Sequence, residues 1–394
     1  MIHRSPHLAS KNDCTGCMAC VDSCKQQAIK SYLDDDGHRY VRVNNDHCIG
    51  CLKCEKVCLG REVFKGSNEL TESLPFAAWA IDNSLRSRST SGGVFAAIAT
   101  AVIKEGGIVV GASFDGRYAK HVVVEDEYHL CSLQGSKYVQ SNTEGIFLAI
   151  ADHLPKQKVL FSGVGCQVAA VLSFFSSHPH KDNLYTIDLI CGGVPSDVLM
   201  EKYFNENKGL DAITSFRSKR HYELKGVVNG KEQVLGRPLP IAGFATEMTN
   251  RYSCYNCQFA YAHRRSDITI GDLWGKFCSE DERNKGISLA ISHNARGFHL
   301  LEGASIKLTP IKWDSFLRMN ARLVIGDTPM TFLRRRLSRN IRTMSYKQFQ
   351  EAYSSIPKIT HPILFIDKVI RVLHRRIKKM KDRVKINRLL LKCR

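Results

Sequence analysis

The chain has 394 residues, of which 43% are apolar, enough for the cores of two or three domains. It contains no apolar run of about 20 residues that could span a membrane, and the first ten residues lack an apolar signal region. We therefore predict a cytoplasmic protein. In that reducing compartment, its fifteen cysteines are expected to bind metal rather than to form disulfides.

The formal charge of +19 suggests a nucleic-acid binder, but its distribution argues against that class. Between Lys368 and Arg394 there are twelve Lys and Arg residues against one acid, Asp382. Thiolate-bound iron–sulfur clusters would remove about six further positive charges. No interleaved aromatic residues accompany the basic segment, so we predict no nucleic-acid partner.

Two segments near the N-terminus share one cysteine spacing. Residues 14–25 read CTGCMACVDSCK and residues 48–59 read CIGCLKCEKVCL, both with the pattern C-x2-C-x2-C-x3-C. This pattern is typical of bacterial two-cluster ferredoxins, in which the fourth cysteine binds the other cluster. Zinc is the alternative, but zinc sites usually take two pairs of cysteines, whereas each segment here has three closely spaced cysteines and a fourth one turn later.

We predict two [4Fe–4S] clusters in a ferredoxin domain over residues 1–65. The first cluster has the ligands Cys14, Cys17, Cys20 and Cys58. The second has the ligands Cys48, Cys51, Cys54 and Cys24. Between the two runs, residues 32–44 alternate in polarity around Asp36 and Gly37, which predicts a β-hairpin.

Residues 87–114 predict a loop, a helix, a Gly-Gly stop and a strand. Ser91, Gly92 and Gly93 lie where the helix begins, so backbone N–H groups there could receive a phosphate, with Arg88 close by in the sequence. An ordinary helix cap followed by two flexible residues is the alternative.

Residues 157–175 and 184–204 each predict a strand followed by a helix, which implies a parallel pair of strands. Cys166 and Cys191 each follow the carboxyl end of one of these strands. If the strands are neighbours, both thiols emerge at the same edge of the sheet, where open α/β sheets bind ligands.

Cys254 and Cys257 form a further C-x2-C pair. Together with Cys166 and Cys191 they make four ligands, which fits either zinc or a third [4Fe–4S] cluster. In a chain that already carries two clusters we favour the third cluster. The remaining cysteines, Cys131, Cys278 and Cys393, are expected to have no role.

Four motifs behind a ferredoxin domain resemble a known family. GSKYVQS (135–141), VLFSGVGCQ (159–167), DLICGGVPS (188–196) and SDITIGDLWG (266–275) occur in the order seen in the coenzyme F420 hydrogenase/dehydrogenase beta-subunit family. Two positions depart from the family pattern: Gly165 stands in place of a proline and Gly192 in place of a histidine. The second departure puts the use of F420 in doubt, because that histidine could donate a proton or hydrogen bond.

The resemblance implies an iron–sulfur flavoprotein that binds FAD. By motif, the FAD site would include Arg88, Ser91, Gly92, Gly93, Gly135, Ser136, Lys137 and Tyr138. Lys137 would offer positive charge to a phosphate or to the reduced flavin. The third cluster would lie closest to the flavin, and the family is also associated with polysaccharide biosynthesis. No catalytic residue can be named from the sequence.

The predicted fold is a ferredoxin-type α+β N-terminal domain followed by an α/β domain with a mixed, partly parallel sheet. The resemblance divides the second part into an N-terminal-like domain at 76–152 and a C-terminal-like flavin and iron–sulfur domain at 156–320.

The leading function is an oxidoreductase that exchanges electrons between the clusters and an FAD-linked small-molecule acceptor or donor, coenzyme F420 or another. Its electron partner would be a low-potential carrier or a partner oxidoreductase. The alternative is an electron-transfer subunit without its own substrate. A structural zinc protein is a third hypothesis.

Residues 360–394 form a basic tail with apolar positions spaced three and four apart, which predicts an amphipathic helix. It could attach peripherally to the anionic inner face of the membrane or dock on an acidic carrier. A solvated helix that packs on its own domain is the plainer alternative.

Overall fold

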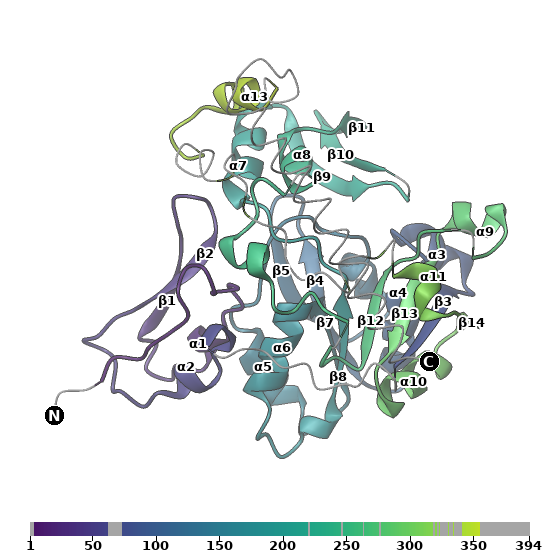
Figure 1. Ribbon diagram of the computed structural model, residues 1–394, viewed down its shortest axis with the longest axis horizontal. Helices are drawn as coiled ribbons and strands as arrows, with labels where there is room; N and C mark the ends of the chain where they lie inside the picture. Colours follow the sequence, from purple (N-terminus) through teal and green to yellow (C-terminus); the bar gives the residue numbers. More distant parts are fainter. Residues whose placement is uncertain are drawn as a thin grey trace.

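The computed structural model describes residues 4–61 and 73–317, apart from residues 220, 246, 263 and 276, together with residues 320, 323, 330, 334 and 341–354. Its arrangement is shown in Figure 1. The basic tail at 360–394 and Cys393 lie outside the described residues. None of the helices in the described ranges is long and apolar enough to cross a bilayer.

The N-terminal region is a small α+β unit built on one hairpin. Its elements are α1 (Ala19–Asp22), β1 (Ile29–Leu33), β2 (Arg39–Val43), α2 (Lys53–Lys56) and η1 (Leu59–Arg61). The hairpin is antiparallel, as predicted, and Leu33 pairs with Arg39. The Asp34 carboxylate closes the turn by accepting hydrogen bonds from the backbone N–H groups of Asp36 (3.1 Å) and His38 (2.9 Å).

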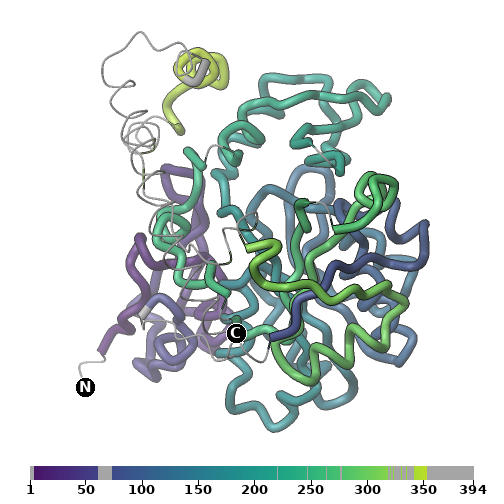
Figure 2. Tube along the Cα trace, turned by 45° about the vertical axis from the view of Figure 1, so that its right-hand side comes forward, coloured from purple at the N-terminus to yellow at the C-terminus, as the bar shows by residue number. Residues whose placement is uncertain are grey.

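This N-terminal unit packs beside a larger α/β unit, as Figures 1 and 2 both show. Helix α1 contacts α5 (Ile146–His153) and α6 (Gly165–Phe174). The Asp22 carboxylate of α1 accepts hydrogen bonds from the N–H groups of Gly145 (2.8 Å) and Phe147 (3.1 Å) at the start of α5. An acid at a helix N-terminus satisfies otherwise unpaired donors, so this contact fixes the N-terminal unit to the rest of the chain.

The larger unit contains a nine-stranded mixed sheet in the order β14-β3-β13-β12-β8-β7-β4-β5-β6. Its strands are β3 (Leu74–Ala80), β4 (Ile108–Phe114), β5 (Ala119–Val124), β6 (Ser141–Asn142), β7 (Val159–Val164), β8 (Leu184–Leu189), β12 (Ile268–Asp272), β13 (Ser288–Ser292) and β14 (Ile306–Pro310). The four adjacent strands β12, β8, β7 and β4 run parallel to one another. The predicted fold class is thereby confirmed. This single sheet contains strands from both of the segments predicted as separate domains, 76–152 and 156–320.

Helices complete the larger unit. They are α3 (Asn83–Arg88), α4 (Val94–Lys104), α5, α6, α7 (Asp197–Glu206), α8 (Leu239–Ala245), α9 (Glu280–Lys285), α10 (Ala295–Glu302), α11 (Trp313–Phe316) and α13 (Tyr346–Ser354), with short 3-10 turns η3 (His129–Leu133), η4 (Lys181–Asn183) and η5 (Tyr252–Asn256). The central strand β7 has Val159, Leu160 and Phe161 fully buried, because a strand covered on both faces is apolar at successive positions.

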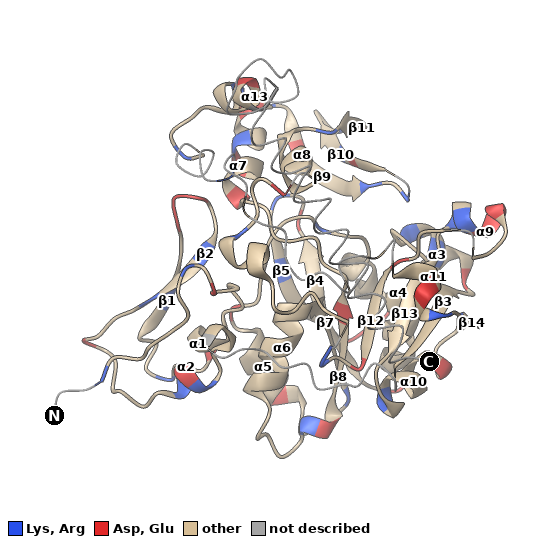
Figure 3. Ribbon diagram, viewed as in Figure 1, with Lys and Arg blue, Asp and Glu red and all other residues tan. Residues whose placement is uncertain are grey.

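A separate three-stranded antiparallel sheet joins β9 (Leu210–Arg217), β10 (Tyr222–Val228) and β11 (Lys231–Gly236) in the order β11-β10-β9. Its core is shared with α7, α8 and α13. Lys, Arg, Asp and Glu are interspersed over the described elements, as Figure 3 shows.

Candidate iron–sulfur and cofactor site

The two N-terminal cysteine runs adopt the same local backbone. Positive φ angles occur at Gly16 (69°) and Met18 (56°) in the first run and at Gly50 (67°) and Leu52 (57°) in the second. A loop that turns in this way directs successive cysteines toward one centre, and glycine lowers the cost of the left-handed conformation. The repeated backbone matches the repeated sequence.

Electrostatics group these cysteines as the spacing predicts. Burial raises the pKa of Cys17 to about 11, and the neighbouring Cys14 and Cys58 raise it further. In the second group, burial raises the pKa of Cys54 to about 11, with smaller contributions from Cys24 and Cys51. Each group thus includes the fourth cysteine of the other run.

The sulfur atoms receive backbone hydrogen bonds of the kind that surround iron–sulfur clusters. Ala9 N–H donates to Cys58 Sγ at 3.3 Å and Ala28 N–H donates to Cys24 Sγ at 3.3 Å. Burial disfavours free thiolates at Cys17 and Cys54, and cluster binding would keep those two sulfurs deprotonated.

A second set of cysteines lies at the edge of the large sheet. Strands β7 and β8 are parallel neighbours, and Val164 pairs with Leu189. Cys166 and Cys191 each follow two residues after this pair. The structure thus brings the two strand ends together as the sequence predicts.

Cys254, within η5, and Cys257, which directly follows η5, lie near this edge. Burial raises the pKa of Cys166 well above its usual value, and Cys257, Cys191 and Cys254 raise it further. Burial likewise raises the pKa of Cys254 to about 12, with added effects from Cys191 and Cys257. We call these four residues the strand-end cysteines.

The strand-end cysteines adjoin the first ferredoxin group. Cys17 is among the thiols that raise the pKa of Cys166, after burial and the other strand-end cysteines. Thr143 Oγ1 also donates a hydrogen bond of 2.9 Å to the Cys17 carbonyl. Within the ranges that the structure describes, no three His, Cys, Asp or Glu residues are grouped as ligands of a single metal ion.

Other side chains pack closely against both positions that depart from the family pattern. A Cβ atom at Gly165 would lie 2.7 Å from Arg264 Nη1, so a larger residue there would displace that guanidinium. Arg264 is buried and pairs with Asp188 at 3.0 Å. A Cβ atom at Gly192 would lie 3.2 Å from Phe244 Cζ, so a phenyl ring borders the position.

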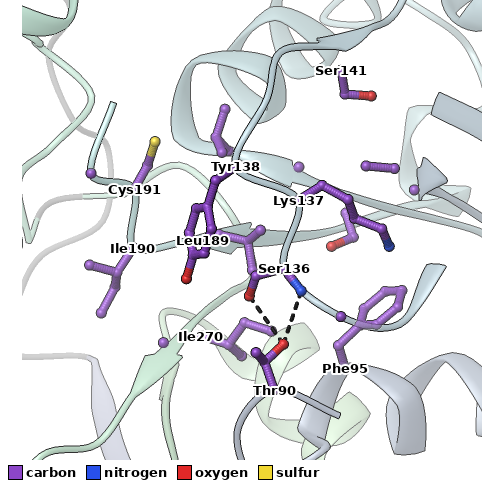
Figure 4. A pocket seen from close by; sticks show the side chains of 18 of the residues that line it. Thr90, Phe95, Ser136, Lys137, Tyr138, Ser141, Leu189, Ile190, Cys191 and Ile270 are labelled. Atoms are coloured by element: carbon purple, nitrogen blue, oxygen red, sulfur yellow. Dashed lines mark hydrogen bonds between the residues drawn. The ribbon is translucent and has the colours of Figure 1, made fainter. Parts of the chain in front are cut away.

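A cavity of about 510 Å³ adjoins the strand-end cysteines. Cys166 and Cys191 line one part of it, and Thr15 and Gly16 of the first cysteine run line another. Its volume falls within the roughly 300–1,000 Å³ that is usual for cofactor and substrate pockets. Figure 4 shows some of the side chains around this cavity.

Six of the eight residues predicted for FAD line this cavity. They are Ser91, Gly93, Gly135, Ser136, Lys137 and Tyr138. The other two do not line it: Arg88 is exposed on α3, and Gly92 packs against the sheet, where a Cβ atom would lie 2.5 Å from the Ala78 carbonyl. Gly92 therefore serves close backbone packing in this structure.

The N-terminus of α4 opens onto the cavity beside a polar loop. Gly93, with φ of 82°, precedes Val94, the first residue of α4. Ser136 N–H donates to Thr90 Oγ1 at 2.9 Å, and their hydroxyls lie 3.1 Å apart, as drawn in Figure 4. These contacts hold the loop at 135–138 against the helix start, where the helix dipole favours an anion.

Among the titratable side chains that line the cavity, burial shifts the pKa of Lys137 and of His121. Lys137 Nζ donates to the carbonyls of Gln134 (2.8 Å) and Ser132 (3.2 Å), and burial lowers its pKa to about 7. Burial lowers the pKa of His121 to about 4, so its ring is neutral near pH 7. Lys137 therefore has a proton to give or accept close to neutral pH.

Aromatic residues line the other part of the cavity. Tyr138 stacks on Phe244 with ring centroids 4.4 Å apart, and Trp274 is 43% exposed there. Arg217 Nη1 donates to Asp272 Oδ2 at 2.6 Å and to Tyr138 Oη at 3.3 Å. This part offers flat apolar surfaces beside a partly buried ion pair, which suits a planar ligand.

Sequence reasoning missed several residues of the cavity. Asp272 and Trp274 lie in the SDITIGDLWG motif, so that motif could have pointed to them. His121, Arg217 and Phe244 lie outside every motif and carried no signal in the sequence. Only the tertiary fold brings these three to the cavity wall.

Comparisons with known proteins agree with this arrangement. Residues 13–59 match the model of the 4Fe-4S dicluster domain. The chain is thus an iron–sulfur protein of electron transfer. Residues 156–311 match the model of the C terminus of the coenzyme F420 hydrogenase/dehydrogenase beta subunit, which confirms the family resemblance seen in the motifs.

One solved structure found by the comparison is the xenon-derivatized F420-reducing [NiFe] hydrogenase complex from Methanosarcina barkeri. The likeness has a TM-score of 0.45 and 16% sequence identity, and it covers 71% of this chain and 91% of that chain. No curated protein matches the sequence.

Proposed function

We propose that this chain is an oxidoreductase that binds three [4Fe–4S] clusters and FAD and passes electrons to or from a small-molecule two-electron carrier. The observation that carries the proposal is the cavity of about 510 Å³ that touches Cys166 and Cys191 as well as the first ferredoxin run. A cavity in that place lets a bound carrier lie close to two groups of cysteines at once.

The strand-end cysteines are proposed to hold the third cluster. The four thiols lie near one edge of the sheet, and burial raises the pKa of Cys166 and of Cys254, so these two are unfavourable as isolated thiolates. In a chain whose first 60 residues already bind clusters, iron–sulfur ligation is the chemistry that fits this set. Zinc would fit the ligand types as well, and metal analysis separates the two.

FAD is proposed to occupy the cavity. The start of α4, with Ser91 and Gly93, and the loop with Ser136 supply N–H and hydroxyl groups that suit phosphates. Tyr138 and Phe244 supply a flat apolar wall. A bound flavin would supply the exchange between one-electron and two-electron chemistry.

Lys137 is proposed to assist at neutral pH because its pKa is lowered to about 7 by burial. Its Nζ could hold or release one proton as the charge of a bound carrier changes. Coenzyme F420 and other hydride carriers remain candidates for the small molecule. Polysaccharide biosynthesis and attachment to a membrane stay predictions.

The proposal is tested by filling the cavity. Ala112 lines the cavity from β4, and Ala112→Trp should abolish FAD retention while iron per chain stays unchanged. Lys120→Trp, at an exposed position of the neighbouring strand β5, is the matched control. FAD is measured by fluorescence after acid release from anaerobically purified protein.

Wild-type protein that neither contains FAD nor takes it up would contradict the proposal. FAD together with turnover of a soluble hydride carrier, without any added protein beyond an electron donor, would support an enzyme. Turnover that requires a partner protein would instead favour the electron-transfer subunit.

A further inference from the structure

Arg251 is a buried cation between two groups of cysteines. Its side chain is among the largest that are fully buried, at 1% exposure. It lies three residues before Cys254, and the Cys254 N–H donates to the Arg251 carbonyl at 3.0 Å. Its own backbone N–H donates to Val194 O at 2.8 Å, so its backbone belongs to the strand-end site.

The guanidinium of Arg251 reaches out of that site into the ferredoxin unit. Nη2 donates to Arg39 O at 2.8 Å, and Nη1 lies 3.4 Å from Cys14 O. The group also packs over the Tyr40 ring, 4.7 Å from its centroid. A Cβ atom at Gly16 would lie 2.6 Å from Nη2, so the guanidinium lies directly against the first cysteine loop.

The acceptors of this guanidinium are neutral in the part of the chain that the structure describes: two carbonyls and the Gln140 Oε1, which accepts at 2.5 Å. The positive charge of Arg251 lowers the pKa of the Asp197 carboxyl, but burial raises that pKa to about 7. Asp197 is therefore only partly ionised near neutral pH and compensates the charge of Arg251 weakly. The charge of Arg251 is therefore not neutralised by its hydrogen-bond acceptors, and it opposes the rise that burial causes in the pKa values of Cys14 and Cys254.

We propose that Arg251 is a positioning and charge-compensating residue that raises the reduction potentials of two adjacent clusters, the one held by Cys14 and the one held by Cys254. The inference rests on the proposed third cluster. Reduction adds one negative charge to a cluster, and a buried cation stabilises that added charge. One electron passing from one cluster to the other breaks no bond and moves no proton.

A shared cation has a specific consequence. Because one charge acts on both clusters, both potentials change in the same direction, and the difference between them changes by less than the larger of the two shifts. The residue thus keeps the two clusters reducible together. The cluster of Cys48, Cys51, Cys54 and Cys24 has no such contact with Arg251 in the hydrogen bonds of the described residues.

The test is an anaerobic redox titration followed by EPR, with iron and flavin counted on each sample. In Arg251→Gln, two midpoint potentials should fall and the third should stay. Arg251→Lys keeps the charge and should remain close to wild type. Lys231→Gln, at an exposed position of β11, makes the same charge change away from the site and should shift nothing.

Gln140→Glu is a second variant that leaves Arg251 in place. It puts a carboxylate next to the guanidinium, so the same two reduction potentials should fall. If Arg251→Gln does not bind its clusters, this variant tests the proposal in its place. Unchanged potentials in a fully loaded variant would overturn the inference, as would an equal fall in Arg251→Lys. Iron near eight per chain with no flavin would instead contradict the proposed function, so the two failures are distinguishable.

Discussion

The ferredoxin cysteines and the strand-end cysteines reach similar chemistry by different routes. The first are set by two short runs of sequence, with the same positive φ angles at Gly16 and Gly50. The second come from four positions spread between Cys166 and Cys257, assembled by the pairing of β7 with β8 and by η5. Local geometry secures the first site, whereas the second depends on the packing of the whole sheet.

The first prediction concerns the buried support beneath the strand-end cysteines. Asp188→Ala removes the carboxylate that pairs with Arg264; the two side chains are 2% and 4% exposed, respectively. The same carboxylate also accepts a hydrogen bond of 2.5 Å from Thr269 Oγ1. Leaving a charge unpaired in the interior should lower the free energy of unfolding by about 3–5 kcal/mol. Denaturant unfolding measures this change.

The matched control breaks an exposed ion pair. Asp281→Ala removes the contact between Asp281 and Lys285 at 2.6 Å on α9, where both side chains are largely exposed. Such a pair is worth about 0.3–0.5 kcal/mol. An equal loss of unfolding free energy in Asp188→Ala and Asp281→Ala would contradict the claim that the strand-end site depends on the buried ion pair.

The second prediction compares two glycines with positive φ. Gly16→Ala introduces a Cβ atom 2.6 Å from Arg251 and Gln140, whereas Gly106→Ala meets no atom within 4 Å. Both carry a backbone cost of about 1 kcal/mol. Gly16→Ala should cost about 1–3 kcal/mol more in unfolding free energy because the contact between the units must shift.

Circular dichroism during thermal unfolding measures both glycine variants. The EPR spectrum of reduced protein should also change in Gly16→Ala and stay as wild type in Gly106→Ala. Indistinguishable variants would mean that the first cysteine loop does not pack tightly on Arg251.

The third prediction concerns pH. The pKa of Lys137 is about 7 in the folded chain and about 10.4 when unfolded, so the unfolded chain binds more protons between these values. Stability of the wild type relative to Lys137→Met should therefore rise from pH 7 to pH 10. After allowance for partial exposure, the gain should be about 2 kcal/mol. A flat difference over this range would show that Lys137 has an ordinary pKa.

The smallest effect is expected at the link between the two units. Asp22→Ala removes the carboxylate that accepts from Gly145 and Phe147 at the start of α5, at a cost of about 1 kcal/mol. Asp82→Ala removes a similar cap, which accepts from Ser84 (2.7 Å) and Leu85 (3.1 Å) on exposed α3. Only Asp22→Ala should increase limited proteolysis between the units.

The sequence allowed much of this fold to be predicted wherever the signals were local. The hairpin between the two cysteine runs, the strand before Cys191 with the helix after it, and the convergence of Cys166 with Cys191 all follow from spacing and periodicity. The contact of Arg251 with Cys14 joins residues 237 positions apart, and nothing local indicates it. The same holds for the pairing of Arg217 with Asp272 and for the phenyl ring beside Gly192.

The central claim is that the strand-end cysteines bind a third cluster, and metal analysis of anaerobically purified protein tests it most directly. Wild type should contain about twelve irons per chain, and Cys254→Ser/Cys257→Ser should contain about eight. Cys131→Ser/Cys278→Ser is the matched double variant and should keep about twelve. About eight irons in every sample would contradict the claim, and so would zinc in place of the missing iron.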